Sequence, residues 1–266
     1  GFHWGVAGAA LATVLSQIAS AVLTLHCLAG SQGMPWHLSA AKLRMERTIL
    51  TAICMIGIPA AAQSALYNVS NLMIQSCMNG FGTNIIAAWG VYGKIDFIFW
   101  MTINSLGIAI TTFVGQNFGA RQYDRVHRGI RICLGMAAGI TVAISVVFYL
   151  AAEPLFQLFS QDPEVITVGV EMMHVLVPAY VTYVCIEIFS GALRGCGDVR
   201  VPTLITVVGV CGLRILWLVL AVPVWHSVAT VELSYPITWV LASLLFIVYY
   251  KRGHWLQRCI AARHGA

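Results

Sequence analysis

Two opposite charges, Lys94 and Asp96, stand two positions apart in the otherwise apolar stretch WGVYGKIDFIFWM, residues 89–101. On a helix, positions i and i+2 lie about 200° apart, so these two side chains do not face each other. Each therefore needs a partner on another helix, or access to water. A carboxylate held in apolar surroundings can bind a proton or a Na⁺ ion, with an affinity that burial and a neighbouring base adjust. We predict that Asp96 couples ion movement and that Lys94 supplies a counter-charge.

A second acid and a second base stand in other apolar runs. Glu187 lies in VTYVCIEIFSGALRG, and Arg214 lies in a run that continues to residue 224. Ionisable groups at membrane depth are costly, and they usually mark ion or substrate pathways. We predict that Glu187 is a second ion-coupling acid and that Arg214 is a second counter-charge. The alternative is a static buried network that pairs Asp96 with Arg214 and Glu187 with Lys94.

Amides and hydroxyls form polar faces on two of the apolar runs. The first face repeats at spacings of 4, 3 and 4 residues from Ser64 to Gln75, and the second runs from Asp96 to Thr111. Such spacings place side chains on one side of a helix. Amides that face lipid are costly, so these faces must meet other helices or a water-filled cavity. An acid beside aromatic and amide groups attracts an organic cation. The predicted substrate cavity is lined by Ser64, Asn68, Asn71, Gln75, Trp100 and Asn104, with interhelical hydrogen bonding as the alternative for the first face.

The elements that must position these side chains are membrane-spanning helices. The chain is 59% hydrophobic and 9% charged, with a mean hydropathy of +0.82, whereas soluble domains carry about 25% charged residues. Apolar runs of about 20 residues or more can cross a bilayer core of about 30 Å, and only helices fit the short connections between them. The sequence thus predicts an all-α, polytopic membrane helical bundle of about seven spans, at 5–29, 48–78, 84–115, 129–152, 165–193, 203–224 and 231–250.

Basic residues gather in alternate connections. Apart from Lys94 and Arg214, every Lys and Arg lies at 42–47, 121–131, 194–200 or 251–263. Because Lys and Arg mark cytoplasmic loops, residue 1 is expected outside and residue 266 in the cytoplasm. The amphipathic segment 35–47 is expected to lie in the membrane interface as a linker.

Prolines and glycines predict local features of the spans. Pro59, Pro178 and Pro236 should each kink or interrupt a helix. Gly135 and Gly139, four residues apart, should let another helix approach closely.

Other site types lack their signatures. The eight cysteines are dispersed without a Cys-x-x-Cys pair, which favours apolar packing over a metal site. Because the sequence has no Walker-type loop and no constellation of nucleophile and base, we expect neither an enzyme nor a nucleotide or nucleic-acid binding protein.

Several helix-end stretches resemble one family. They are GVAGAALAT at 5–13, TFVGQNFGA at 112–120 and SGALRGCGD at 190–198, with a weaker agreement in SYPITW at 234–239. Each is a short string, but their order and their positions in a bundle of this orientation are typical of multidrug and toxic-compound extrusion (MATE) transporters. The resemblance covers almost the whole chain, and its form looks bacterial.

The resemblance implies a division of the chain. MATE transporters have two six-helix lobes, with sites in or between the lobes and access that alternates by lobe rocking. Because the sequence begins without Met, we expect Gly1 to be an internal cut in a longer chain. On the family's template we expect the last helix of the first lobe at 1–30, a cytoplasmic interlobe linker at 31–47, the six-helix second lobe at 48–250 and a basic cytoplasmic tail at 251–266.

The resemblance also implies a function. Family members exchange an organic substrate for Na⁺ or H⁺ through membrane-embedded acids, with no cofactor besides the coupling ion. Asp96 and Glu187 lie on helices that resemble those carrying second-lobe acids in some branches, while other branches place the coupling acid in the first lobe. We therefore expect a secondary antiporter of organic, cationic drugs or metabolites in the bacterial inner membrane. Its partners would be the lipid bilayer, a small organic substrate, and the missing first lobe or a second copy.

Two other functions stay open. A lipid-linked oligosaccharide flippase of the same superfamily would have a more cationic cavity. A channel-like or non-transporting membrane subunit would show conductance that is independent of a gradient, or no transport.

Overall fold

The computed structural model describes residues 5–31, 33–34, 37–38 and 44–264. These residues form two compact units, which divide between Cys54 and Met55 inside one helix. Most of the predicted interfacial linker at 35–47 lies outside the described residues.

The first unit contains helix α1, Gly5–Gly30, and the first turns of α2, Arg47–Asn79. The large apolar side chains along α1 are exposed within this unit, with Val22 at 59% and Leu23 at 70% of full exposure. A helix that is apolar and uncovered by its own unit needs lipid or another helix around it.

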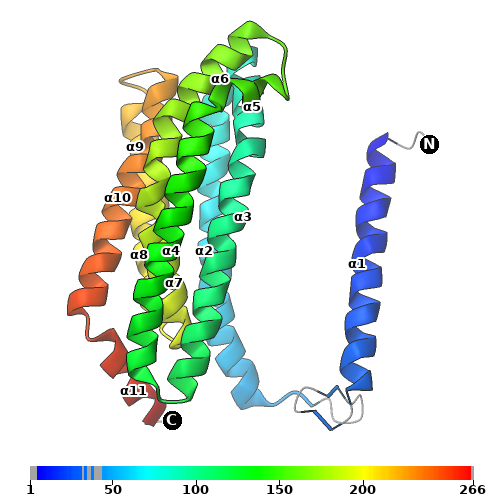
Figure 1. Ribbon diagram of the computed structural model, residues 1–266, viewed down its shortest axis with the longest axis vertical. Helices are drawn as coiled ribbons and strands as arrows, with labels where there is room; N and C mark the ends of the chain where they lie inside the picture. Colours follow the sequence, from blue (N-terminus) through cyan, green and yellow to red (C-terminus); the bar gives the residue numbers. More distant parts are fainter. Residues whose placement is uncertain (1–4, 32, 35–36, 39–43, 265–266) are drawn as a thin grey trace. The chain divides into compact units, whose positions relative to one another are not determined.

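The second unit is a bundle of long helices joined by short connections (Figure 1). It continues α2 from Met55 and carries the remaining helical segments. These segments are α3 Thr83–Gly119, α4 Tyr123–Leu150, α5 Ala152–Gln157, α6 Pro163–Leu176, the 3₁₀ turn η2 Val177–Ala179, α7 Tyr180–Gly195, α8 Arg200–Thr206, the π-helical turn η3 Val207–Gly212, α9 Leu213–Ala221, α10 Val228–Arg252 and α11 Trp255–His264.

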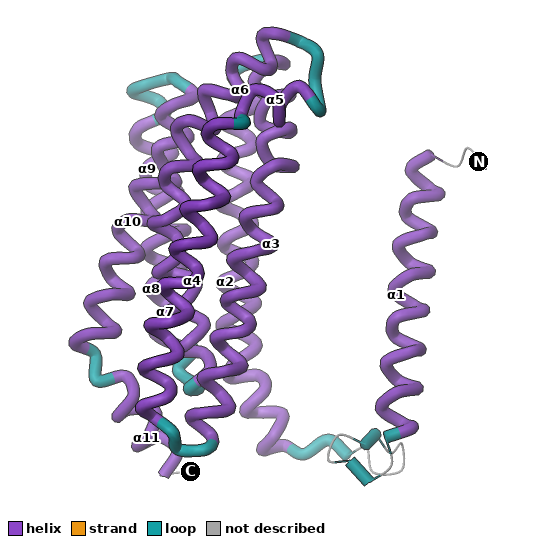
Figure 2. Tube along the Cα trace, viewed as in Figure 1, coloured by secondary structure: helices purple, strands orange, loops and turns teal. Residues whose placement is uncertain are grey.

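The predicted membrane spans are confirmed by the structure. Within the described part of the chain, seven helical stretches are long and apolar enough to cross a bilayer, and their order matches the predicted runs. Figure 2 shows the second unit as helices joined by short connections. The chain is therefore an all-α, multi-pass membrane bundle, as its composition predicts.

Two spans are interrupted, for different reasons. Pro178 lies in the 3₁₀ turn between α6 and α7, where the proline ring cannot continue an α-helical hydrogen-bond ladder. The turn at Val207–Gly212 is π-helical, and hydropathy does not predict it because a single inserted residue leaves the apolar character of the span unchanged. Pro59 and Pro236, by contrast, lie inside the continuous helices α2 and α10.

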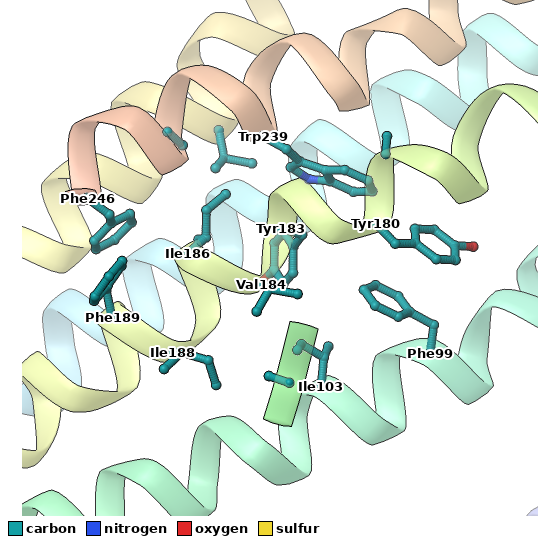
Figure 3. Packing of buried hydrophobic residues seen from close by; sticks show 14 of the residues in the cluster. Phe99, Ile103, Tyr180, Tyr183, Val184, Ile186, Ile188, Phe189, Trp239 and Phe246 are labelled. Carbon is teal, nitrogen blue, oxygen red and sulfur yellow. The ribbon is translucent and has the colours of Figure 1, made fainter. Parts of the chain in front are cut away.

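Helix α7 forms the centre of the second unit. It packs against α3, α4 and α10, and most of its side chains are buried. Figure 3 shows Tyr180, Tyr183 and Phe189 of α7 among Phe99 of α3 and Trp239 of α10. The outer faces of the bundle carry exposed apolar side chains instead, such as Ile108 at 70% and Leu150 at 77%. Such a surface suits the hydrocarbon interior of a membrane.

Glycines allow α3 and α7 to approach closely. A Cβ at Gly191 would lie 2.8 Å from the carbonyl oxygen of Gly107, and a Cβ at Gly195 would lie 2.6 Å from that of Thr111. The Thr111 hydroxyl donates across this contact to the Gly191 carbonyl at 3.0 Å. Small residues at the crossing replace side-chain packing with direct backbone contact.

Replacing Gly195 by Ala is therefore expected to destabilise the bundle by about 1–3 kcal/mol, because the added carbon overpacks a backbone contact. The thermal unfolding of the purified protein in detergent measures this loss. Gly135→Ala is the matched control, since a Cβ there meets no described atom within 4 Å. Equal melting temperatures for the two variants would contradict the close contact.

The same observation corrects the prediction for Gly135 and Gly139. Both lie on an exposed face of α4, and no described part of this chain packs against them. The spacing of four residues sets which face of the helix they share, but it does not select the neighbour that covers this face.

The basic tail forms helix α11 beneath the bundle. The Trp255 indole donates to the Tyr250 carbonyl at 3.2 Å, and the His127 ring nitrogen lies 3.0 Å from the Tyr250 hydroxyl. Burial raises the pKa of the Cys259 thiol to about 11 and that of the Cys196 thiol to about 12. Both thiols therefore stay protonated at neutral pH and act as packing groups.

Candidate substrate and ion site

A cavity of about 360 Å³ lies between α2, α3 and α10 of the second unit. One acid and several aromatic rings and amides surround it. Its lining residues are Tyr67, Asn71, Gln75, Trp89, Tyr92, Gly93, Asp96, Trp100, Tyr235 and Trp239.

Asp96 accepts hydrogen bonds on both carboxylate oxygens. The Trp100 indole donates to one oxygen at 2.7 Å, and the Tyr180 hydroxyl donates to the other at 2.5 Å. The Tyr92 and Tyr180 hydroxyls lie 3.0 Å apart. Because Tyr180 gives its only proton to the ionised carboxylate, Tyr92 must be the donor in that pair. The two donors orient the carboxylate and stabilise its negative charge, and the bond from Tyr92 holds the Tyr180 hydroxyl in place.

Aromatic rings form the walls around Asp96. Trp239 lies edge-on to Trp100, with ring centroids 6.3 Å apart, and edge-on to Tyr235 at 5.3 Å. Tyr180 stacks on Phe99, with ring centroids 4.1 Å apart, and Figure 3 shows these two rings side by side. The faces of electron-rich rings attract organic cations, so the acid and the rings together form a suitable environment for a compound with a positive charge and an apolar body.

Arg214 lies directly behind this aromatic wall and not in an ion pair. Its guanidinium is 4.1 Å from the centre of the Tyr235 ring and 5.8 Å from that of Tyr67. It donates one long hydrogen bond of 3.4 Å to Thr238, while its Nε and Nη1 have no hydrogen-bond partner among the described residues. The side chain is fully buried. No described acid pairs with Arg214, because cation–π contacts occupy its guanidinium, and its role as a counter-charge stays a prediction.

Glu187 lies on α7, at the crossing with α3. Its carboxylate fills the space over Gly107, where a Cβ would clash with Oε1. Arg194 reaches Oε1 at 3.7 Å, and the Tyr183 hydroxyl donates to Oε2 at 3.3 Å. The acid is not among the residues that line the cavity around Asp96. The alternative of a Glu187–Lys94 pair is wrong, because Arg194 is the basic partner.

Lys94 is exposed, and its Nζ lies 5.4 Å from the ring centre of Phe159. It forms no ion pair with a described residue. Lys94 is not a direct partner of Asp96, because the angle between positions i and i+2 turns it away from the helix face that carries Asp96. A long basic side chain on an outward face extends its charge toward water.

The predicted polar faces divide in the structure. Asn71, Gln75 and Trp100 line the cavity. Ser64, Asn68 and Asn104 are exposed within the unit. Asn68 donates to the Ser64 carbonyl at 3.0 Å, and Asn104 donates to the Trp100 carbonyl at 2.9 Å. Their own helices thus partly satisfy these amides.

A comparison with protein families identifies the bundle. The MatE family model matches residues 59–220, which is more than half of the chain. The chain belongs to the MatE family. The match confirms the family that the helix-end motifs indicate, and it includes most of the helices that surround the cavity.

Two curated relatives resemble this chain at 26–28% sequence identity. The chain is 26% identical over 250 residues to Probable multidrug resistance protein YoeA of Bacillus subtilis, covering 93% of this chain and 54% of that protein. It is 28% identical over 244 residues to Probable multidrug resistance protein NorM of Aromatoleum aromaticum, covering 86% and 49%. The chain thus spans about half the length of the curated relatives it matches.

Solved structures show the same fold. The bent form of the Vibrio cholerae MATE transporter VcmN superposes with a TM-score of 0.80 at 19% identity, covering 97% of this chain and 57% of that one. At the level of the family, MatE members are membrane transporters and not enzymes.

Several residues of this candidate site are not among those that the sequence predicts. The side chains of Tyr92, Tyr180, Tyr235 and Trp239 complete the surroundings of Asp96. The sequence does indicate the aromatic residues on α3. Trp89, Tyr92, Asp96 and Trp100 repeat at spacings of 3, 4 and 4, which places them on one helix face. No such pattern predicts which ring of α7 or α10 meets that face.

Glu232 of α10 is a further buried acid, outside the predicted site residues. It is 3% exposed, and one of its oxygens has no hydrogen-bond partner among the described residues. It is not among the residues that line the cavity, so we assign it no part in the site.

Proposed function

We propose that this chain belongs to a secondary antiporter that exports organic, cationic compounds in exchange for Na⁺ or H⁺. The cavity in which Asp96 stands among aromatic rings carries the proposal. Relatives named as multidrug resistance proteins support small-molecule export as the activity of the complete protein.

In this proposal Asp96 binds the coupling ion and attracts the organic cation. One carboxylate cannot hold both at full strength, so the two cations compete for it and favour different states of the lobe. Asn71, Gln75 and Trp100 contact the substrate within the cavity. Ser64, Asn68 and Asn104 would extend the lining on the exposed side, where another lobe could close over them. Glu187 would be a second acidic station.

The proposed organisation follows the family template. Residues 1–30 would be the last helix of the first lobe, 31–47 the linker, 48–250 the second lobe and 251–266 the cytoplasmic tail. The missing first lobe, or a second copy of this chain, would complete the transport pathway. The protein would lie in the bacterial inner membrane.

The proposal is tested by ethidium efflux from proteoliposomes that contain the complete protein. An imposed Na⁺ or H⁺ gradient is expected to drive efflux, and dissipating that gradient is expected to stop it. Ion currents that persist without a gradient of substrate or coupling ion, together with no ethidium movement, would instead support a channel-like subunit.

The aromatic wall makes a separate prediction. Trp100→Leu is expected to weaken ethidium binding about thirtyfold, because a desolvated cation–π contact contributes about 2 kcal/mol. Trp100→Phe should retain most of the affinity, because the Phe ring still offers an aromatic face to the cation. The hydrogen bond to Asp96 is lost in this variant. Trp217→Leu is the control, because its indole donates to the Thr230 carbonyl and is not among the cavity-lining residues. Fluorescence titration of ethidium measures all three, and equal losses in the Trp100→Leu and Trp217→Leu proteins would contradict the assigned wall.

A further inference from the structure

A second candidate site lies far along α3 and α4 from the cavity, at the end of the bundle where basic residues gather. Arg125, Arg128 and Arg131 project from the first turns of α4, and all three are exposed. The positive-inside rule assigns this end to the cytoplasmic membrane surface. These arginines therefore stand at the depth of the lipid headgroups.

Two adjoining hollows open among these arginines. One, of about 290 Å³, is lined by Arg125, Arg128, Gly129 and Ile132 of α4 with Phe113 of α3. The other, of about 310 Å³, is lined by Arg128, Arg131 and Ile132. Arg128 and Ile132 line both hollows, so the two hollows adjoin each other and share one arginine.

The charge of the hollows is not balanced by nearby acids. Among the residues that the structure describes, none of the three arginines forms an ion pair. Arg125 donates to the Gln122 side chain at 2.9 Å, which is a neutral partner. Asp124 is the one acid in the first turn of α4. Planar guanidinium groups bind phosphate oxygens through paired hydrogen bonds.

Apolar surface adjoins the basic groups on the membrane side. Ile132 is 53% exposed one helical turn beyond Arg128. The Phe113 ring lies over Gly129, where a Cβ would come within 2.1 Å of it. A ligand with a phosphate headgroup and an acyl chain matches this order of basic and apolar side chains along the helix, whereas free phosphate would use the arginines alone.

We propose that the first turns of α4 bind the headgroup of an anionic phospholipid, with one phosphate in each hollow. A lipid with two phosphates, such as cardiolipin, therefore binds more tightly than phosphatidylglycerol, which has one. This site is independent of the transported substrate and of Asp96.

The test counts bound lipids by native mass spectrometry of the complete protein, titrated with cardiolipin, phosphatidylglycerol, phosphatidylethanolamine or inorganic phosphate. Arg128→Gln is expected to weaken cardiolipin binding about tenfold, because it removes the guanidinium that both hollows share. Arg200→Gln is the matched control, because it removes another exposed basic residue, at the start of α8 and outside both hollows. That variant should stay within about twofold of the unchanged protein.

Three results would overturn the proposal. Equal losses in the two variants would mean that cardiolipin responds to the general positive field of this surface. Equal affinity for cardiolipin and phosphatidylglycerol would remove the assignment of two phosphates. If inorganic phosphate, at the concentration used for cardiolipin, displaced the bound cardiolipin, the hollows would be an anion site that does not select a lipid. A single symmetrical gel-filtration peak for Arg128→Gln would show that weaker lipid binding does not result from unfolding of the variant.

Discussion

Replacing Asp96 by Asn is expected to abolish ethidium export driven by an ion gradient while leaving the protein folded. Asn is nearly isosteric, and its side-chain oxygen still accepts a hydrogen bond from Trp100 or Tyr180, whose present distances are 2.7 and 2.5 Å. It cannot, however, carry the negative charge that the coupling ion and the organic cation share. Efflux from proteoliposomes should fall to the level of protein-free vesicles.

Lys94→Gln is the matched control for this prediction. It removes a charge from the same helix, two residues away, but at an exposed position that does not line the cavity. Efflux by this variant should remain close to that of the unchanged protein. Undiminished coupled efflux by Asp96→Asn would remove Asp96 from the mechanism, and an equal loss in both variants would indicate a general effect of charge on α3.

Glu187→Gln is expected to reduce coupled export at least about tenfold while leaving the affinity for ethidium close to normal. The reduction follows from losing the second acidic station, because Gln cannot carry the charge of a carboxylate that lies 3.7 Å from Arg194 and 3.3 Å from the Tyr183 hydroxyl. Hydrogen bonds to charged groups contribute about 1.5–3 kcal/mol. Affinity should persist because Glu187 does not line the cavity that surrounds Asp96.

Arg194→Gln separates coupling from anchoring. If Glu187 serves only to hold Arg194, the two single variants should lose export equally, and the double variant should lose no more. If Glu187 is an acidic station, Arg194→Gln should keep gradient-driven export that Glu187→Gln lacks. Initial efflux rates under the same imposed gradient decide between these outcomes.

The sequence predicts most of the fold, because length and hydropathy alone determine a membrane span. The seven runs, their order and the break at Pro178 all follow from such local properties. The π-helical turn at 207–212 does not, since its residues have ordinary apolar character. Residue spacing also does not predict which helix packs against the face of α4 that carries Gly135.

The candidate site was less predictable for the same reason. Spacing along α3 places Asp96 and Trp100 on one face, and these residues do line a common cavity. The partners of the charges depend on how each helix is rotated against its neighbours. Arg214 meets aromatic rings and Glu187 meets Arg194, whereas counting depth in the membrane favours acid–base pairs between helices. Two charged residues can lie at the same depth in the membrane, but the rotation of each helix about its own axis determines whether their side chains touch.

The most direct test of a shared cation site is the affinity of the purified, complete protein for ethidium, measured by fluorescence titration at increasing Na⁺ concentration and at decreasing pH. If Asp96 binds the organic cation and the coupling ion in turn, raising one of these two ions should weaken ethidium binding in proportion to its concentration. The Asp96→Asn protein should bind ethidium weakly and without that dependence. Ethidium affinity that is unchanged by both ions, or the same dependence in the variant, would contradict the account.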